Sequence, residues 1–161
     1  MQQNSFTLSQ ATQKLEYYCS YQERCHNEVI EKLRSLKMTS DEIDQIVVHL
    51  IQNNFLNEER FACSFARGKH NIKYWGKVRI VNELKFRNIS KYNIDKALQE
   101  ISTETYLANF HFISERNWES TKETNPIKKK KKFCDYLLRK GFESNIVFEK
   151  WKELASSTSS D

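Results

Sequence analysis

The chain has 161 residues, 29% of them charged and 39% hydrophobic, and its 26 basic and 21 acidic side chains give a net charge of +5. No apolar run approaches the roughly 18 residues of a membrane span. The N-terminus lacks the basic-then-apolar order of a signal peptide, so we expect a cytoplasmic protein that makes no membrane contact. Only three glycines and one proline are present, which disfavours a turn-rich sandwich or barrel.

The cysteines indicate neither a disulfide framework nor a metal site. Cys19, Cys25, Cys63 and Cys134 are scattered, without a Cys-x-x-Cys pair. Cys25 precedes His26, but no second pair stands at a zinc-ligand spacing. We therefore expect no metal and no cofactor.

The first predicted repeat, residues 11–56, follows a short N-terminal tail at 1–10. Apolar residues at helical spacing predict helices over 11–20 and 26–36. A third helix should begin at Thr39 or Ser40, either of which can cap it, and should stop near Asn53.

The second predicted repeat covers 57–103, with helices at 57–69 and 77–87 and a third after the junction at 88–90. The third repeat covers 104–155, with a helix at 106–118, a linker at 119–128 that contains Pro126, and a helix from 129 to Gly141. Gly141 lies where a left-handed C-cap is needed. Residues 156–161, SSTSSD, are expected to be disordered.

All three repeats contain one apolar pattern, with successive steps of 4, 5, 5, 4 and 3 residues. The pattern comprises Val29, Leu33, Met38, Ile43, Val47 and Leu50, then Ile80, Leu84, Ile89, Ile94, Leu98 and Ile101, then Phe133, Leu137, Phe142, Val147, Trp151 and Leu154. A period of about fifty residues indicates repeated units that bury apolar faces against their neighbours. We expect an all-α fold, in which a tandem array of three three-helix repeats forms an elongated, curved molecule.

The charge is uneven along the chain. Residues 1–60 hold 6 basic and 9 acidic side chains, whereas residues 61–101 hold 9 basic and 3 acidic ones. The candidate binding face consists of Arg67, Lys69, Lys73, Trp75, Lys77, Arg79, Lys85, Arg87, Lys128, Lys129, Lys130, Lys131, Lys132, Arg139 and Lys140. Cations interleaved with aromatic rings suit nucleic acid, because charges follow phosphates and rings stack on bases. An acidic protein surface would attract the same cations. The simplest alternative is that these cations face solvent and only keep the chain soluble.

Catalytic motifs are absent from the sequence. It has no phosphate-binding glycine loop, no Gly-x-Ser-x-Gly and no His-Glu-x-x-His. The four histidines fall in separate segments without a shared carboxylate pattern. We therefore expect a binding protein rather than an enzyme, with no catalytic residue.

Three ordered motifs resemble the RecX family of bacterial recombination regulators. They are Phe55-Leu56-Asn57-Glu58-Glu59-Arg60-Phe61-Ala62, then Trp75-Gly76-Lys77-Val78-Arg79-Ile80 with Glu83-Leu84, then Leu137-Leu138-Arg139-Lys140-Gly141-Phe142. The resemblance covers roughly Leu15 to Leu154. The lysine block at 128–132 is heavier than in the family.

This resemblance implies a monomeric regulator that binds the RecA recombinase filament. RecX-like proteins bind RecA on single-stranded DNA, inhibit strand exchange and the coupled ATPase, and can bind DNA, with double-stranded DNA as a further ligand. Two other functions compete with this one: a helix-turn-helix module that reads duplex DNA, and a helical scaffold for another protein whose charge serves solubility.

Overall fold

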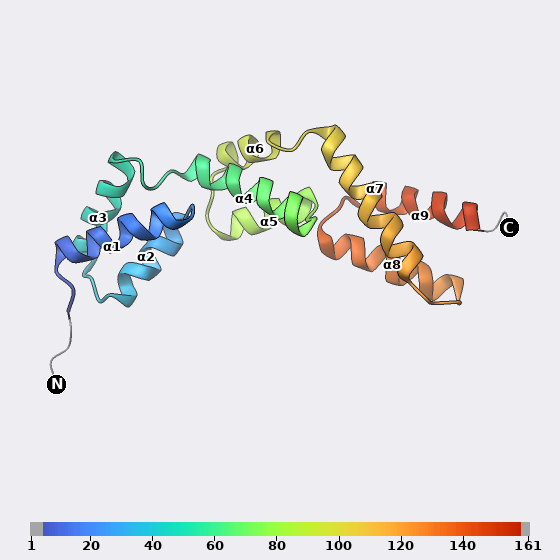
Figure 1. Ribbon diagram of the computed structural model, residues 1–161, viewed down its shortest axis with the longest axis horizontal. Helices are drawn as coiled ribbons and strands as arrows, with labels where there is room; N and C mark the ends of the chain where they lie inside the picture. Colours follow the sequence, from blue (N-terminus) through green and yellow to red (C-terminus); the bar gives the residue numbers. More distant parts are fainter. Residues whose placement is uncertain (1–4, 159–161) are drawn as a thin grey trace.

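The computed structural model describes residues 5–158, which fold into nine α-helices with no strand among them (Figure 1). The helices are α1 (Leu8–Tyr21), α2 (His26–Ser35), α3 (Ser40–Gln52), α4 (Glu58–Lys73), α5 (Lys77–Phe86), α6 (Lys91–Gln99), α7 (Thr103–Ser120), α8 (Pro126–Lys140) and α9 (Ser144–Thr158). The helix pairs in extensive contact all lie within one set of three: α1–α3, α4–α6 or α7–α9. These sets stand in a gently bowed row, which confirms the expected tandem array of three-helix repeats.

Short polar side chains begin most of the helices. Thr39 caps α3 by accepting a hydrogen bond from the Glu42 N–H, and the Glu42 carboxylate accepts one from the Thr39 N–H in return. The Ser90 and Ser102 hydroxyls cap α6 and α7 by accepting from the Asn93 and Thr105 N–H groups. These caps satisfy amide groups that the first turn of a helix leaves without partners.

The second helix of each repeat ends in the same backbone conformation. Lys37, Asn88 and Gly141 follow α2, α5 and α8, and their φ angles are 61°, 59° and 98°. These residues stand at equivalent positions, because the next residue in each repeat is the third apolar residue of the pattern and is buried. A left-handed residue turns the chain sharply at the helix end, so the repeats match in backbone as well as in pattern.

Several element boundaries differ from the sequence-based expectation. The connection expected over 119–128 comprises residues 121–125, because α7 continues to Ser120 and Pro126 opens α8. Proline fits the first turn of a helix, where its missing N–H costs nothing, and Asn125 caps that turn. At the chain ends, residues 8–10 and 156–158 are helical, while 1–4 and 159–161 lie outside the described residues.

The apolar pattern faces the interior throughout. Its members are buried, except for Val47, Leu98, Trp151 and Leu154, which are partly buried. The first repeat has a core of its own, whereas the second and third repeats share one continuous core that Cys25 joins from the first. Repeats two and three therefore form one packed body, and the candidate site lies along it.

Candidate nucleic-acid interface

The start of α5 is capped by groups of the third repeat. The Gly76 N–H donates to the Lys140 carbonyl at 2.7 Å, and the Val78 N–H donates to the Gly141 carbonyl at 3.0 Å. The Lys77 N–H donates to the Tyr106 hydroxyl at 3.1 Å. Since Gly76 offers no capping side chain, these bonds satisfy the first turn and fix the end of α8 against the start of α5.

A buried polar network supports this junction. The Tyr106 hydroxyl donates to the Glu143 carboxylate at 2.6 Å, and burial is the main cause that raises the pKa of this phenol. The Tyr106 ring stacks on His70, which is fully buried. His70 Nδ1 lies 3.0 Å from the Trp75 carbonyl, an acceptor, so Nδ1 carries the proton. The turn that holds Trp75 is thereby fixed in place.

Cations and aromatic rings alternate along one side of the second repeat, in what we call the cation ladder. Its members, in spatial order, are Arg87, Phe65, Lys69, Trp75, Arg79 and Lys140. The Arg87 guanidinium lies 4.8 Å from the Phe65 ring centre, Lys69 Nζ lies 5.5 and 4.9 Å from Phe65 and Trp75, and the Arg79 guanidinium lies 4.0 Å from Trp75. Cation–π attraction holds these charges in a row.

The ladder continues across the junction to α8. Arg79 donates to the Arg139 carbonyl at 3.3 Å, and Lys140 Nζ donates to the Lys73 carbonyl at 2.9 Å. Partial burial, together with the charges of Arg79 and Lys73, lowers the pKa of Lys140. Three like charges therefore crowd this end of the ladder, and a bound anion would relieve their repulsion.

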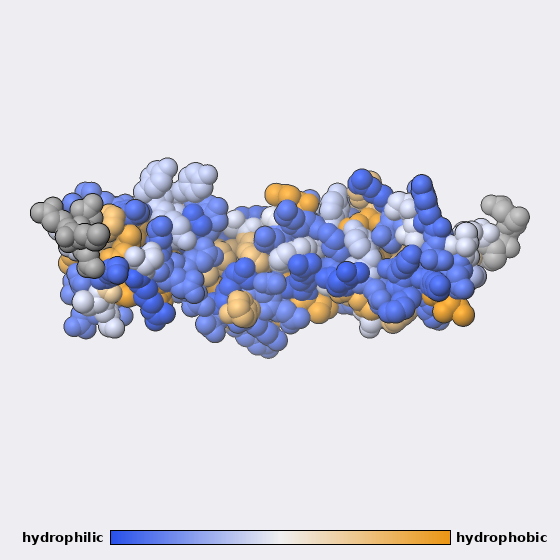
Figure 2. Space-filling model, turned by 90° about the horizontal axis from the view of Figure 1, so that it is seen from below, coloured by the Kyte–Doolittle hydropathy of each residue, from blue (hydrophilic) through white to orange (hydrophobic). Residues whose placement is uncertain are grey.

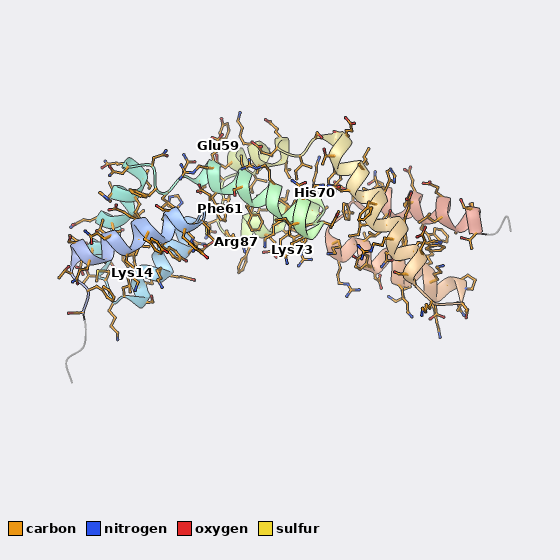
Figure 3. All side chains as sticks on the ribbon, viewed as in Figure 1. Lys14, Glu59, Phe61, His70, Lys73 and Arg87 are labelled. Atoms are coloured by element: carbon orange, nitrogen blue, oxygen red, sulfur yellow. The ribbon has the colours of Figure 1, made fainter. Side chains whose placement is uncertain are left out.

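Few of the ladder cations form ion pairs. Within residues 5–158, Arg87 is the one ladder cation with an ion pair, to Glu83 at 2.8 Å. Figure 3 shows Arg87 and Lys73 on the lower side of α4, with Glu59 on the upper side. The lower face of the molecule is largely hydrophilic, with hydrophobic patches between the hydrophilic side chains (Figure 2).

Other members of the candidate face lie apart from the ladder. Arg67 pairs with Glu100 at 3.0 Å, at the end of α6. Lys77 Nζ lies 4.7 Å from the Tyr106 ring, within the junction. Lys85 and Arg139 are exposed, and Arg139 adjoins the ladder through its carbonyl group.

The lysine block at 128–132 occupies the opposite end of α8 from Lys140. At 1.5 Å of rise per residue, about 15 Å separates the middle of the block from Lys140 along the helix axis. Lys131 and Lys132 pair with acids, whereas Lys129 and Lys130 lie over tryptophan rings, as the ladder cations lie over theirs. The block is thus a separate patch with reduced free charge.

Sequence reasoning missed two kinds of contributor. Phe65 is not among the predicted site residues, although its ring binds two ladder cations. Phe112 and Arg116 were not selected, although both are exposed on α7 beside the end of the ladder. Their spacing of four residues puts them on one helix face, and an aromatic residue four positions before an arginine was the signal available in the sequence.

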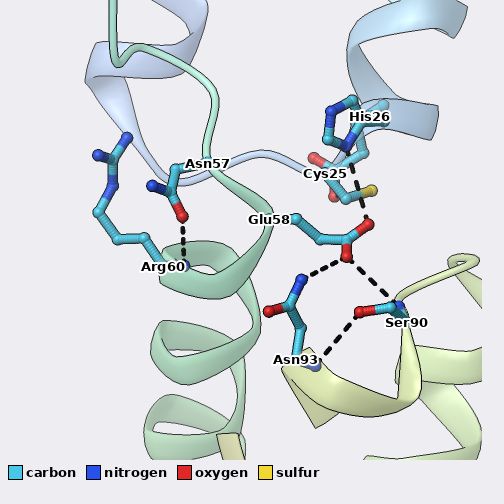
Figure 4. Close-up of polar contacts among 8 residues, drawn as sticks. Cys25, His26, Asn57, Glu58, Arg60, Ser90 and Asn93 are labelled. Carbon is cyan, nitrogen blue, oxygen red and sulfur yellow. Dashed lines mark hydrogen bonds and ion pairs between the residues drawn. The ribbon is translucent and has the colours of Figure 1, made fainter. Parts of the chain in front are cut away.

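The motif around Asn57 holds the first two repeats together (Figure 4). Asn57 caps α4 by accepting from the Arg60 N–H. The Glu58 carboxylate accepts from the Ser90 N–H and the Asn93 side chain, and it lies 4.0 Å from His26 of the first repeat. The residues that carry the family resemblance here therefore have a structural role.

Within residues 5–158, no cluster of three or more histidine, cysteine, aspartate or glutamate side chains could hold a metal ion. No helix in the same range combines the length and apolar character that crossing a bilayer requires.

Comparison with known proteins gives consistent matches. The family model described as the second three-helix domain of RecX matches residues 57–98. The regulatory protein RecX of Bacillus cytotoxicus is 28% identical over 130 residues, which cover 81% of this chain and 48% of that protein. The regulatory protein RecX of Bacillus mycoides is 26% identical over the same shares. The chain thus spans about half the length of these curated relatives, which are named as regulatory proteins.

Solved structures show the same fold. A crystal structure of regulatory protein RecX superposes with a TM-score of 0.80 at 22% identity, covering 91% of this chain and 73% of that one. RecX from Lactobacillus salivarius superposes with a TM-score of 0.77 at 27% identity, covering 92% of this chain and 96% of that one. The family model, the relatives and the fold agree with the three motifs in their similarity to RecX regulatory proteins.

Proposed function

We propose that this chain binds the RecA filament on single-stranded DNA and inhibits its recombinase and ATPase activity. The relatives are named regulatory proteins, and the family resemblance supplies RecA as the partner. The observation that carries the proposal is the cation ladder, where Lys69, Arg79 and Lys140 stand in a row without an acidic partner in the described part of the chain. A nucleoprotein filament offers a long anionic surface that such a row would follow.

The bowed row of repeats supports binding along a filament rather than at one point. The second and third repeats share a core and a capped junction, so they would present the ladder as one rigid surface. The first repeat is linked to the second by the contact between His26 and Glu58. Because the first repeat has more acidic than basic side chains, it would contact protein rather than DNA. Such a clamp would restrict the motion of RecA subunits during ATP turnover.

The test is the DNA-dependent ATP hydrolysis of a cognate RecA, with this protein titrated in. We expect hydrolysis to fall as the protein is added and to recover at high salt, because the ladder contacts are ionic. Unchanged hydrolysis at several-fold molar excess would refute the proposal. Sequence-dependent binding to duplex DNA alone would instead identify a helix-turn-helix module.

A further inference from the structure

A cleft opens where the ladder ends, between the end of α4 and the helices α7 and α8. Its volume is about 420 Å³, within the range of small-ligand sites. Its lining includes three aromatic and three charged side chains: Tyr74, Phe112, Tyr136, Lys73, Arg116 and Lys140. The charged residues of the lining are all cations.

The aromatic rings leave one surface open. Phe112 is 52% exposed, although an aromatic side chain of this size is usually buried. One side of its ring stacks on Tyr74, with ring centres 5.9 Å apart and planes at 29°. Tyr74 has a φ of 56°, a strained conformation for a residue with a side chain, and the turn it makes holds this ring against Phe112. A supported ring with an accessible side is the arrangement on which a nucleobase stacks.

The cations surround this platform and connect it to the ladder. Within residues 5–158, Lys73 and Arg116 have no ion-pair partner, and Lys140 belongs to both the cleft and the ladder. The ladder rings differ from Phe112, because cations already lie over Phe65 and Trp75. The ladder therefore suits phosphates, and the cleft suits a base.

We propose that this cleft binds an unstacked base of single-stranded DNA on Phe112, with the adjoining phosphates on Lys73, Arg116 and Lys140. The inference rests on the proposed function, since it assigns a site to the DNA strand of the filament. An acidic peptide would satisfy the three cations equally, but it would leave the supported Phe112 ring unused. Duplex DNA would hide its base faces within the stack.

The experiment measures DNA binding by the full chain without RecA. Fluorescence anisotropy compares a labelled oligothymidylate with an abasic strand of the same length, which has the same phosphates and no bases. We expect the oligothymidylate to bind about tenfold more tightly, the scale of one base stacked on an aromatic ring. Phe112→Leu, which keeps the apolar contact with Tyr74, should abolish that difference and leave abasic binding unchanged.

Matched variants separate the cleft from general effects. Phe148→Leu replaces a phenylalanine of similar exposure, 41%, on α9 away from the cleft, and should keep the difference between strands. Lys73→Gln should weaken binding of both strands. It should also reduce the slope of log affinity against log salt concentration by roughly 0.7. Equal binding of both strands by the parent protein would overturn the inference, and so would an unchanged preference in Phe112→Leu.

Two further results keep this inference distinct from the proposed function. If Phe112→Leu impaired RecA inhibition while the strand preference persisted, the cleft would be a protein-docking site and the inference would be wrong. If the parent protein preferred the base-bearing strand through Phe112 and yet left RecA hydrolysis unchanged, the cleft assignment would stand while the proposed function failed.

Discussion

Gly76 and Gly141 lie back to back at the junction of the second and third repeats. A Cβ on Gly76 would come within 2.3 Å of the Gly141 carbonyl carbon and oxygen, and a Cβ on Gly141 would come within 2.2 Å of the Arg79 Cβ. This close approach lets α8 cap α5 and brings Arg79 beside Lys140. The ladder crosses between repeats because both residues lack side chains.

Gly76→Ala should therefore destabilise the chain. The added methyl group meets backbone on the other side of the junction, which cannot move aside as a flexible side chain could. Overpacking of this kind costs about 1–3 kcal/mol. The free energy of unfolding, measured by denaturant titration, checks the prediction.

Gly68→Ala is the matched control. Gly68 lies inside α4, and a Cβ there would meet nothing within 4 Å. Alanine favours a helix over glycine by about 0.5–1 kcal/mol, so this variant should gain stability. Equal stability changes for the two variants would show that the back-to-back contact is absent in solution.

Leu137→Ala tests the shared core of the second and third repeats. Leu137 is fully buried, whereas its neighbour Leu138 is 38% exposed. Removing a buried leucine side chain costs about 2–5 kcal/mol, while Leu138→Ala should change stability far less. Denaturation midpoints of the two variants give the comparison, and a loss below about 0.5 kcal/mol for Leu137→Ala would contradict the alignment of the repeats.

The repeat architecture could be predicted because its signals are local. Burial follows the spacing of the apolar pattern, and N-caps such as Thr39 and Ser90 stand beside the helices they begin. A left-handed end at Gly141 also follows from residue type alone. Each of these features depends on a few neighbouring residues.

The arrangement of the site could not be predicted in the same way. Phe65 and Arg87 are far apart in sequence, and their contact depends on how α5 packs against α4. The lysine block is five consecutive positive charges in the sequence, but Asp135 pairs with Lys131, and Glu123 from the preceding loop pairs with Lys132. Composition shows which charges exist, whereas packing decides which of them remain available.

The Glu115–Lys150 pair predicts a specific acid sensitivity. Lys150 is 3% exposed, and its Nζ lies 2.8 Å from Glu115 and 3.4 Å from Glu153. The hydrogen bond from Lys150, followed by its charge, lowers the pKa of Glu115 below its ordinary 4.5. The stabilisation is therefore present above that ordinary pKa and is lost as the pH falls through the lower folded-state pKa.

Glu115→Gln should accordingly lose stability at neutral pH and show a shallower further loss below pH 4.5. Urea denaturation as a function of pH measures both effects. Glu119→Gln, on the same helix and without an ion-pair partner in the described residues, should keep the parent pH profile. If the stability of Glu115→Gln fell below pH 4.5 as steeply as that of the parent protein, the pair would contribute nothing to the acid sensitivity.

The ladder and the lysine block should differ in their effect on DNA binding. Lys69→Gln with Arg79→Gln removes two cations that have no acidic partner among residues 5–158, whereas Lys131→Gln with Lys132→Gln removes two that pair with Asp135 and Glu123. Each phosphate contact contributes roughly 0.7 to the salt dependence on single strands, so the first double variant should lose about 1.4 of that slope. The second should lose less, because an already paired lysine displaces fewer counterions. The measurement is the affinity of both double variants for single-stranded DNA across a series of salt concentrations. Equal losses of slope in the two variants would mean that the number of charges, rather than the ladder geometry, governs binding.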